Sequence, residues 1–134
     1  MELRVQPECA VAIEDHARRA FPRECCGVLL GRDGPVREVS RVVVIEAEQK
    51  TNRYFVPPEE LLRAGREAEA AGLDVVGIYH SHPNCSSQAS EYDRRHALPF
   101  WSYLIVSCVM GHVASTQSWR LRDDGSRFDE ERLL

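Results

Sequence analysis

Apolar residues in the first third of the chain change from helical to extended spacing. Between Pro7 and Ala20, apolar or small residues recur every three or four positions and charged residues fill the opposite face. This spacing predicts an amphipathic helix with proline in its first turn and Pro22 beyond its end. The apolar run 26–31, a turn-forming segment at 32–35 and an extended segment at 36–45 then predict a β-hairpin.

A second helix and a buried strand are predicted next. Pro57 and Pro58, followed by two glutamates, indicate a helix start, because proline suits the first turn and carboxylates favour the positive end of the helix dipole. Gly72 is expected to end this helix. Its expected core stripe consists of Leu61, Leu62, Gly65 and Ala68. Residues 74–82 are apolar on both faces, which predicts a central strand.

The last third predicts a short helix and a strand pair. Residues 90–97 can form a helix that Pro99 stops, and 103–110 and 113–121 read as strands joined at a glycine turn. The charged tail 123–134 is expected to form a short strand or a frayed end. The predicted fold class is therefore α+β, with a mixed, mostly antiparallel sheet and flanking helices.

Length and charge exclude several classes of protein. A chain of 134 residues with 43% hydrophobic composition suits one domain, 1–134. The net charge is −4 and no Lys/Arg cluster exceeds a pair, so no nucleic-acid partner is expected. No signal peptide and no apolar stretch of about 18 residues are visible, which argues against a membrane partner. The expected location is the cytoplasm.

Cysteine usage agrees with a reducing compartment. The five cysteines form an odd set without a CxxC pair, and most are expected to be buried. Cys85 differs because it follows His82 by three positions in an expected loop. A role for Cys85 as a metal ligand or redox sensor stays open at this point, because zinc favours thiolate ligands.

His80 and His82 carry the clearest chemical signal. Side chains two positions apart on a strand point to the same face, so the two imidazoles converge. Asp93 can supply a third ligand, which leaves the fourth tetrahedral position of Zn²⁺ for water, as in catalytic zinc sites. Iron or manganese could occupy the same ligands.

The other histidines and the aromatic residues do not belong to a comparable pattern of candidate metal ligands. His16, His96 and His112 are expected on the surface or on a helix face. The expected core or its rim includes Tyr79, Trp101, Tyr103 and Trp119.

The histidine pair lacks a base of its own. Zinc-assisted hydrolysis needs a carboxylate to accept the proton of water, but Ser81 stands between the histidines. Glu24, just before the first apolar strand, is the best candidate, because it can reach across the end of a sheet. Ser90 has two readings, a helix N-cap or a donor to the oxyanion of a tetrahedral intermediate, and one hydroxyl can serve both.

These residues together resemble the JAMM (MPN+, JAB1/MPN/Mov34) metalloprotease family. The family pattern is a glutamate near the first strand, then HxH and a downstream aspartate, with a serine shortly before that aspartate. Here Glu24, His80, His82 and Asp93 meet the pattern, with ten residues between His82 and Asp93, and Ser90 takes the serine position. The resemblance implies zinc bound by His80, His82 and Asp93, Glu24 as general base and then acid, and Ser90 at the oxyanion.

The segment 22–31 is similar to small bacterial Mec+-like members of the family. That likeness implies an MPN/JAB-type fold and a zinc peptidase or isopeptidase that hydrolyses the C-terminal amide or adduct of a ubiquitin-like sulfur-carrier protein ending in Gly-Gly. Polyubiquitin is not expected, because the chain is too short for the insertions that hold it. Two alternatives stay open: a non-catalytic MPN binding module, and a zinc amide hydrolase with a peptide or small-molecule substrate.

Overall fold

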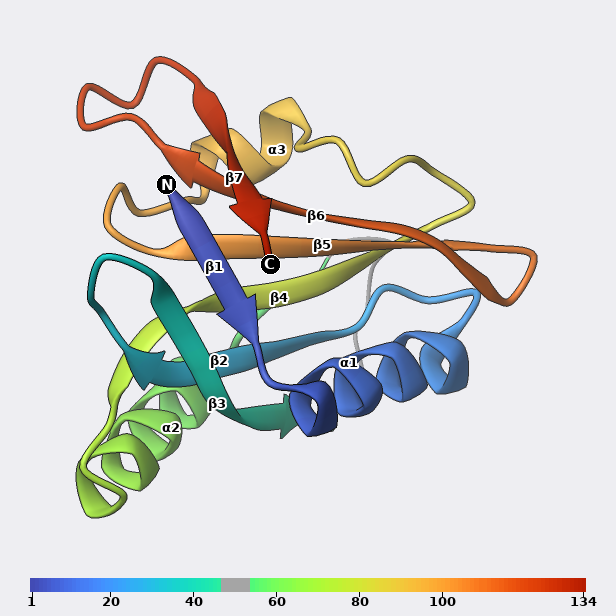
Figure 1. Cartoon of the computed structure of the whole chain (residues 1–134). Coiled ribbons are helices and arrows are strands. Elements are labelled where there is room, and N and C mark those ends of the chain that lie inside the picture. The colour runs from blue at the N-terminus through green and yellow to red at the C-terminus, as the bar shows by residue number, and fades with distance from the viewer. Residues whose placement is uncertain (47–53) are drawn as a thin grey trace.

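The strands close into a barrel in the computed structural model, which describes residues 1–46 and 54–134 (Figure 1). The strand order around the barrel is β1-β3-β2-β4-β5-β6-β7. The strands are β1 (Glu2–Val5), β2 (Cys26–Arg32), β3 (Arg37–Ile45), β4 (Asp74–Pro83), β5 (Ser102–Val109), β6 (His112–Leu121) and β7 (Phe128–Leu133). The helices are α1 (Pro7–Ala20), α2 (Pro58–Ala70) and α3 (Glu91–Arg95).

The mixed sheet agrees with the predicted fold class. β4 pairs parallel with β5, and β1 pairs parallel with β3 and β7, while the remaining neighbours are antiparallel. The closure itself was not predicted, because β1 is too short to give a periodic signal. The C-terminal segment forms β7 and pairs with β1, so the prediction of a strand there is confirmed.

α1 and α2 pack on different faces of the sheet, which explains why β2 and β4 are apolar on both sides. One apolar cluster contains Ile13 and Ala17 of α1, and the other contains Ala64 and Ala68 of α2. The predicted stripe of α2 is wrong at Leu62, whose exposed fraction is 57%. Ala64 takes its place, because it lies one helical turn before Ala68. None of the helices in residues 1–46 and 54–134 is long and apolar enough to cross a membrane.

His16 lies on a helix face, which is one of the two expected positions, but this face is buried. It lies on the buried side of α1, where its Nδ1 is 2.7 Å from the hydroxyl of Tyr79. Burial lowers the pKa of His16. Gly27 makes this contact possible, since a Cβ at that position would lie 2.1 Å from the Tyr79 ring. His96 and His112 are exposed, as predicted.

A group of buried or partly buried polar residues lies beside the first half of β4 and is called here the polar network. Its members are Arg37, Ser102, Ser118, Arg120 and Glu131. Arg37 donates to the Val76 carbonyl at 3.1 Å and to Ser102 Oγ at 2.9 Å. The Ser102 and Ser118 hydroxyls donate to Glu131 Oε1 at 2.7 and 2.9 Å, and Arg120 forms an ion pair with Glu131. The network therefore joins β3, β4, β5, β6 and β7.

Candidate metal centre

The second half of β4 carries His80 and His82, and the neighbouring strand brings Glu24 to them. In the antiparallel pairing of β2 and β4, Cys26 lies opposite His80, so the chain just before β2 passes beside the histidines. One ligand atom from each of Glu24, His80 and His82 lies within 4.8 Å of the others. Glu24 therefore reaches across the end of the sheet to the histidines, as predicted.

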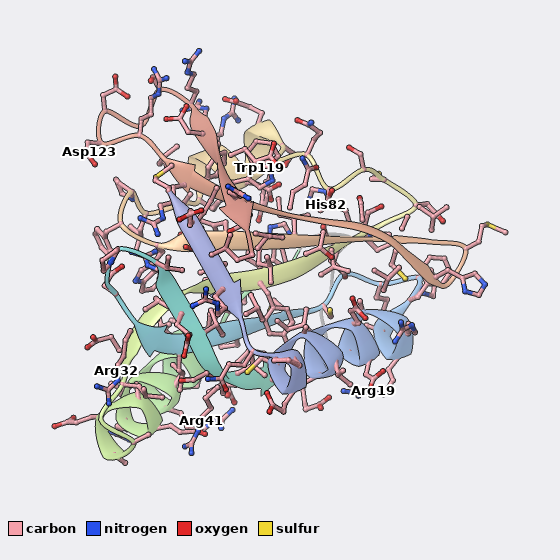
Figure 2. The ribbon with its side chains drawn as sticks, in the orientation of Figure 1. Arg19, Arg32, Arg41, His82, Trp119 and Asp123 are labelled. Carbon is pink, nitrogen blue, oxygen red and sulfur yellow. The ribbon has the colours of Figure 1, made fainter. Side chains whose placement is uncertain are left out.

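Asp93 meets the same histidines from α3. Its Oδ2 lies 3.2 Å from His82 Nε2, and its Oδ1 lies 3.4 Å from His80 Nε2. His82, at the end of β4, is labelled in Figure 2. The structure thus brings together the three side chains for which a shared metal ion was predicted.

Ser90 fixes the start of α3 through a reciprocal capping box. The Asp93 backbone N–H donates to Ser90 Oγ at 3.1 Å, and the Ser90 backbone N–H donates to Asp93 Oδ2 at 2.8 Å. The N-cap reading of Ser90 is correct. Because the hydroxyl acts as an acceptor in this bond, its hydrogen can still be donated elsewhere.

Ser81 has a positioning role that sequence reasoning missed. The Cys25 backbone N–H donates to Ser81 Oγ at 2.9 Å, and the Ser81 N–H donates to the Cys25 carbonyl at 3.1 Å. These two bonds attach the residue next to Glu24 to the strand that carries both histidines. Strand alternation could have indicated this, because the residue between two ligands on a strand must point to the other face.

The electrostatics of His80 and Asp93, but not those of His82, favour the protonation states that metal ions bind. Burial lowers the pKa of His80 to about 4, which keeps its imidazole neutral. Burial alone would raise the pKa of Asp93, but hydrogen bonding with His82, the nearby His80 and the bonds from Ser90 hold it at about 2. Burial opposes protonation of His82 as well, yet its contacts with Asp93 and Ser86 raise its pKa overall.

His80 provides the strongest structural argument for a bound metal. Its side chain is fully buried, and among the residues that the structure describes neither ring nitrogen has a hydrogen-bond partner. Such a buried polar atom is costly unless another partner satisfies it. A cation held jointly by His80, His82 and Asp93 would satisfy Nε2 and neutralise the carboxylate. The residues present therefore fit a metal ion.

A cleft of about 660 Å³ opens in front of these groups. Pro22 and Glu24 line one side, and residues 82–86, 88–90 and 92–93 line the other.

Cys85 lies exposed on this lining, while the other four cysteines are buried, as predicted. Burial raises the pKa of Cys25 to about 11 and that of Cys26 to about 12, so both thiols stay protonated. Cys85 is not part of the group of Glu24 and the two histidines, and its role as ligand or sensor stays an untested prediction.

Comparison with known proteins identifies the family of the chain. Residues 7–122 match the family described as prokaryotic homologs of the JAB domain. The chain belongs to this family. The prediction of a JAMM/MPN resemblance is thereby confirmed. The JAB match spans the whole site, from the segment that carries Glu24 to the helix that carries Asp93.

Named relatives and a solved structure extend over most of this JAB-domain chain. A CysO-cysteine peptidase of Mycobacterium tuberculosis is 33% identical over 120 residues, which cover 89% of this chain and 82% of the relative. A desampylase of Haloferax volcanii is 39% identical over 104 residues, 72% of this chain and 73% of the relative. A solution structure from Desulfitobacterium hafniense superimposes with a TM-score of 0.84 at 32% identity, covering 98% of this chain and 91% of that one. Family and site together make the chain a hydrolytic metallopeptidase.

Proposed function

We propose that the chain is a zinc-dependent peptidase or isopeptidase that hydrolyses the C-terminal amide or adduct of a ubiquitin-like sulfur-carrier protein. The observation that carries the proposal is the meeting of Glu24, His80, His82 and Asp93 beside an open cleft. The substrate class is supported by two relatives, a CysO-cysteine peptidase and a desampylase, which match most of the chain.

His80, His82 and Asp93 would hold the zinc. Two neutral imidazoles and an ionised carboxylate form a nitrogen and oxygen ligand set that zinc accepts readily, and three protein ligands leave a position open. When bound, zinc polarises the scissile carbonyl and lowers the pKa of water to about 7. The protein contributes the orientation of the ligands, which comes from the β4 backbone and from the capped start of α3.

Glu24 accepts the proton of the attacking water and later donates it to the leaving amine. It is half-buried, lies with His80 and His82 within 4.8 Å, and lines the cleft into which a substrate amide would reach. Ser90 donates its hydroxyl hydrogen to the oxygen of the tetrahedral intermediate. Its position at the cleft wall and its hydrogen bond as acceptor from Asp93 support this role.

The cleft suits an extended peptide better than a folded surface. Its volume of about 660 Å³ leaves room for a slender Gly-Gly tail. The cytoplasm is the proposed location, because all five cysteines are free thiols, as is usual in a reducing compartment. The residues 1–134 would act as one catalytic domain.

The test uses a carrier–cysteine adduct as substrate and compares wild type with His82→Ala and Glu24→Gln. His82→Ala should lose bound zinc, measured by metal analysis after dialysis. Glu24→Gln should keep zinc at wild-type stoichiometry but lose about 100-fold to 10,000-fold in kcat, because general acid–base catalysis contributes that much. Chelator should abolish wild-type turnover, and zinc should restore it more fully than iron or manganese.

Three results would contradict the proposal. Normal turnover by Glu24→Gln would remove Glu24 from the chemistry. Carrier binding by the protein with unchanged affinity after His80→Ala, together with no turnover in wild type, would favour a non-catalytic binding module. Cleavage of short free peptides as fast as the carrier adduct would favour the broader amide hydrolase.

A further inference from the structure

The two histidines of the metal centre are held in different ways. His82 donates its Nδ1 hydrogen to the Ser86 carbonyl at 2.8 Å, which fixes the ring and presents Nε2 toward Asp93. Such a hydrogen bond on the second nitrogen is the usual way in which a ligand histidine is oriented. His80 has no corresponding bond at Nδ1 within residues 1–46 and 54–134.

Tyr54 occupies the face of the His80 ring. The two ring centroids lie 4.1 Å apart with an interplanar angle of 14°, which is a parallel stack. Tyr54 is itself buried, with 9% of its surface exposed, and it precedes α2 in the chain. The ring of His82 is the other aromatic neighbour of His80, at 5.0 Å and tilted by 48°.

We propose that Tyr54 is a positioning residue for the metal centre, and that its stack on His80 replaces the missing hydrogen bond. The terminal torsion of a histidine side chain is broad, so an unbonded imidazole can tilt without great cost. A ring stacked in parallel at van der Waals distance prevents that tilt and holds the plane in which the ligand nitrogen lies. This inference rests on the proposed function, in which His80 is a zinc ligand.

The stack also explains how a fully buried imidazole can be oriented without a second polar partner. Burying a carboxylate or carbonyl acceptor beside His80 Nδ1 would require more polar atoms in the apolar cluster under α2. An aromatic ring belongs to that cluster and adds no charge. Tyr54 therefore connects the packing of the core to the geometry of the metal site.

A merely structural role predicts a different outcome from a positioning role. Tyr103 offers a matched control, because it belongs to the same apolar cluster, is 2% exposed and pairs with Phe128 and not with His80. If Tyr54 only fills space, replacing either tyrosine should have the same effect on the metal. If Tyr54 positions His80, only its replacement should weaken metal binding.

The experiment measures zinc affinity by competition with a chromophoric chelator for wild type, Tyr54→Phe, Tyr54→Leu and Tyr103→Leu. We expect Tyr54→Phe to bind zinc within about 2-fold of wild type, because the ring remains. Tyr54→Leu should bind about 10-fold to 100-fold more weakly, the usual loss when the support of a ligand histidine is removed. Tyr103→Leu should lower the unfolding midpoint but bind zinc as wild type does.

The visible absorption bands of the cobalt-substituted proteins provide a second readout. They report ligand geometry, so they should change in Tyr54→Leu and stay the same in Tyr54→Phe and Tyr103→Leu. Tyr54→Met, which fills a similar volume without a ring, serves the same comparison if the leucine variant does not fold. Wild-type affinity in Tyr54→Leu or Tyr54→Met, or equal losses at Tyr54 and Tyr103, would overturn the positioning role. Wild-type protein that binds no zinc would instead contradict the proposed function itself.

Discussion

The two ends of β4 both bury polar side chains, but these side chains are satisfied to different degrees. At the first end, opposite charges of the polar network meet within the protein: Glu131 accepts two hydroxyl hydrogens and pairs with Arg120, while Arg37 donates to Val76 and Ser102. Among the described residues, Arg120 Nε has no hydrogen-bond partner, but the same guanidinium is paired with Glu131. At the other end, His80 is just as deeply buried, yet no described residue hydrogen-bonds to its ring nitrogens.

The difference separates a structural site from a functional one. A charged network whose partners are all protein groups holds strands together and needs nothing further. A buried imidazole of which neither nitrogen has a hydrogen-bond partner, beside an ionised carboxylate, costs free energy that an additional partner would recover. Burial of polar residues alone therefore does not mark a functional site; a buried side chain with no hydrogen-bond partner at any of its polar atoms does.

The largest expected effect is a loss of stability when the polar network at the structural end is disrupted. Glu131→Gln removes the carboxylate but leaves the guanidinium of Arg120, so the free energy of unfolding should fall by about 3–5 kcal/mol. Urea unfolding measures this loss, and zinc affinity of the folded variant should be unchanged. Asp129→Asn serves as the control. Asp129 lies on β7 like Glu131, but it is an exposed partner of Arg122, so its replacement should leave stability unaltered. A large loss of zinc affinity in Glu131→Gln would show that the ends are coupled.

A second prediction concerns acid, which should lower the stability of the protein through the buried His80 of the metal end. In metal-free protein the pKa of His80 is about 4, below its ordinary value of 6.5, so the unfolded chain binds more protons between these values. The contribution of His80 to the free energy of unfolding is fully present above pH 6.5 and is lost as the pH drops toward 4. The loss is on the order of 3 kcal/mol, at about 1.4 kcal/mol per pKa unit.

The measurement is urea unfolding in chelator across that pH range. His80→Leu should show a flatter dependence, with the remaining slope due in part to His16, whose pKa is also lowered. The raised pKa of His82 acts in the opposite sense and at higher pH, where its contribution is lost as the pH rises through the folded-state value. An unchanged slope in His80→Leu would contradict the assignment.

The smallest expected effect lies within the metal end. Ser81→Ala leaves the buried Cys25 N–H without its acceptor, which should cost about 1 kcal/mol of stability. The chain that carries Glu24 should then be held less firmly, so kcat should fall by about 10-fold while zinc remains bound. Steady-state kinetics and metal analysis measure both, and Ser81→Thr, which keeps a hydroxyl, should recover most of the rate. Equal kcat values in wild type and Ser81→Ala would refute the positioning role of Ser81.

Periodic segments were predictable from sequence because their packing is local. The spacing of Cys9, Ile13 and Ala17 gave α1 at its observed bounds, and the two-sided apolar run gave β4. The meeting of Glu24 with the histidines was also predicted, with the help of the family resemblance. The roles of Glu24 and Ser90 in catalysis, and the extent of the domain, stay predictions.

The remainder depends on contacts between segments far apart in the chain. β1 has only four residues, and pairing with β3 and β7 makes it a strand. His16 is buried because Tyr79 meets it across 63 positions of sequence, which no local pattern reveals. The stack of Tyr54 on His80 is likewise a contact between two segments far apart in the chain. Such tertiary contacts override what hydropathy alone indicates for a single residue.

The pairing of β1 with β7 also sets an order of events during synthesis. The backbone N–H of Arg132 donates to the Met1 carbonyl, and that of Leu134 donates to the Leu3 carbonyl. β1 is synthesised before β7, so it must wait for residues 128–133 before the barrel can close, and such long-range pairing is slow to form. Glu24, the histidines of β4 and Asp93 of α3 all emerge earlier, so a nascent chain can assemble its metal site while the barrel is still open.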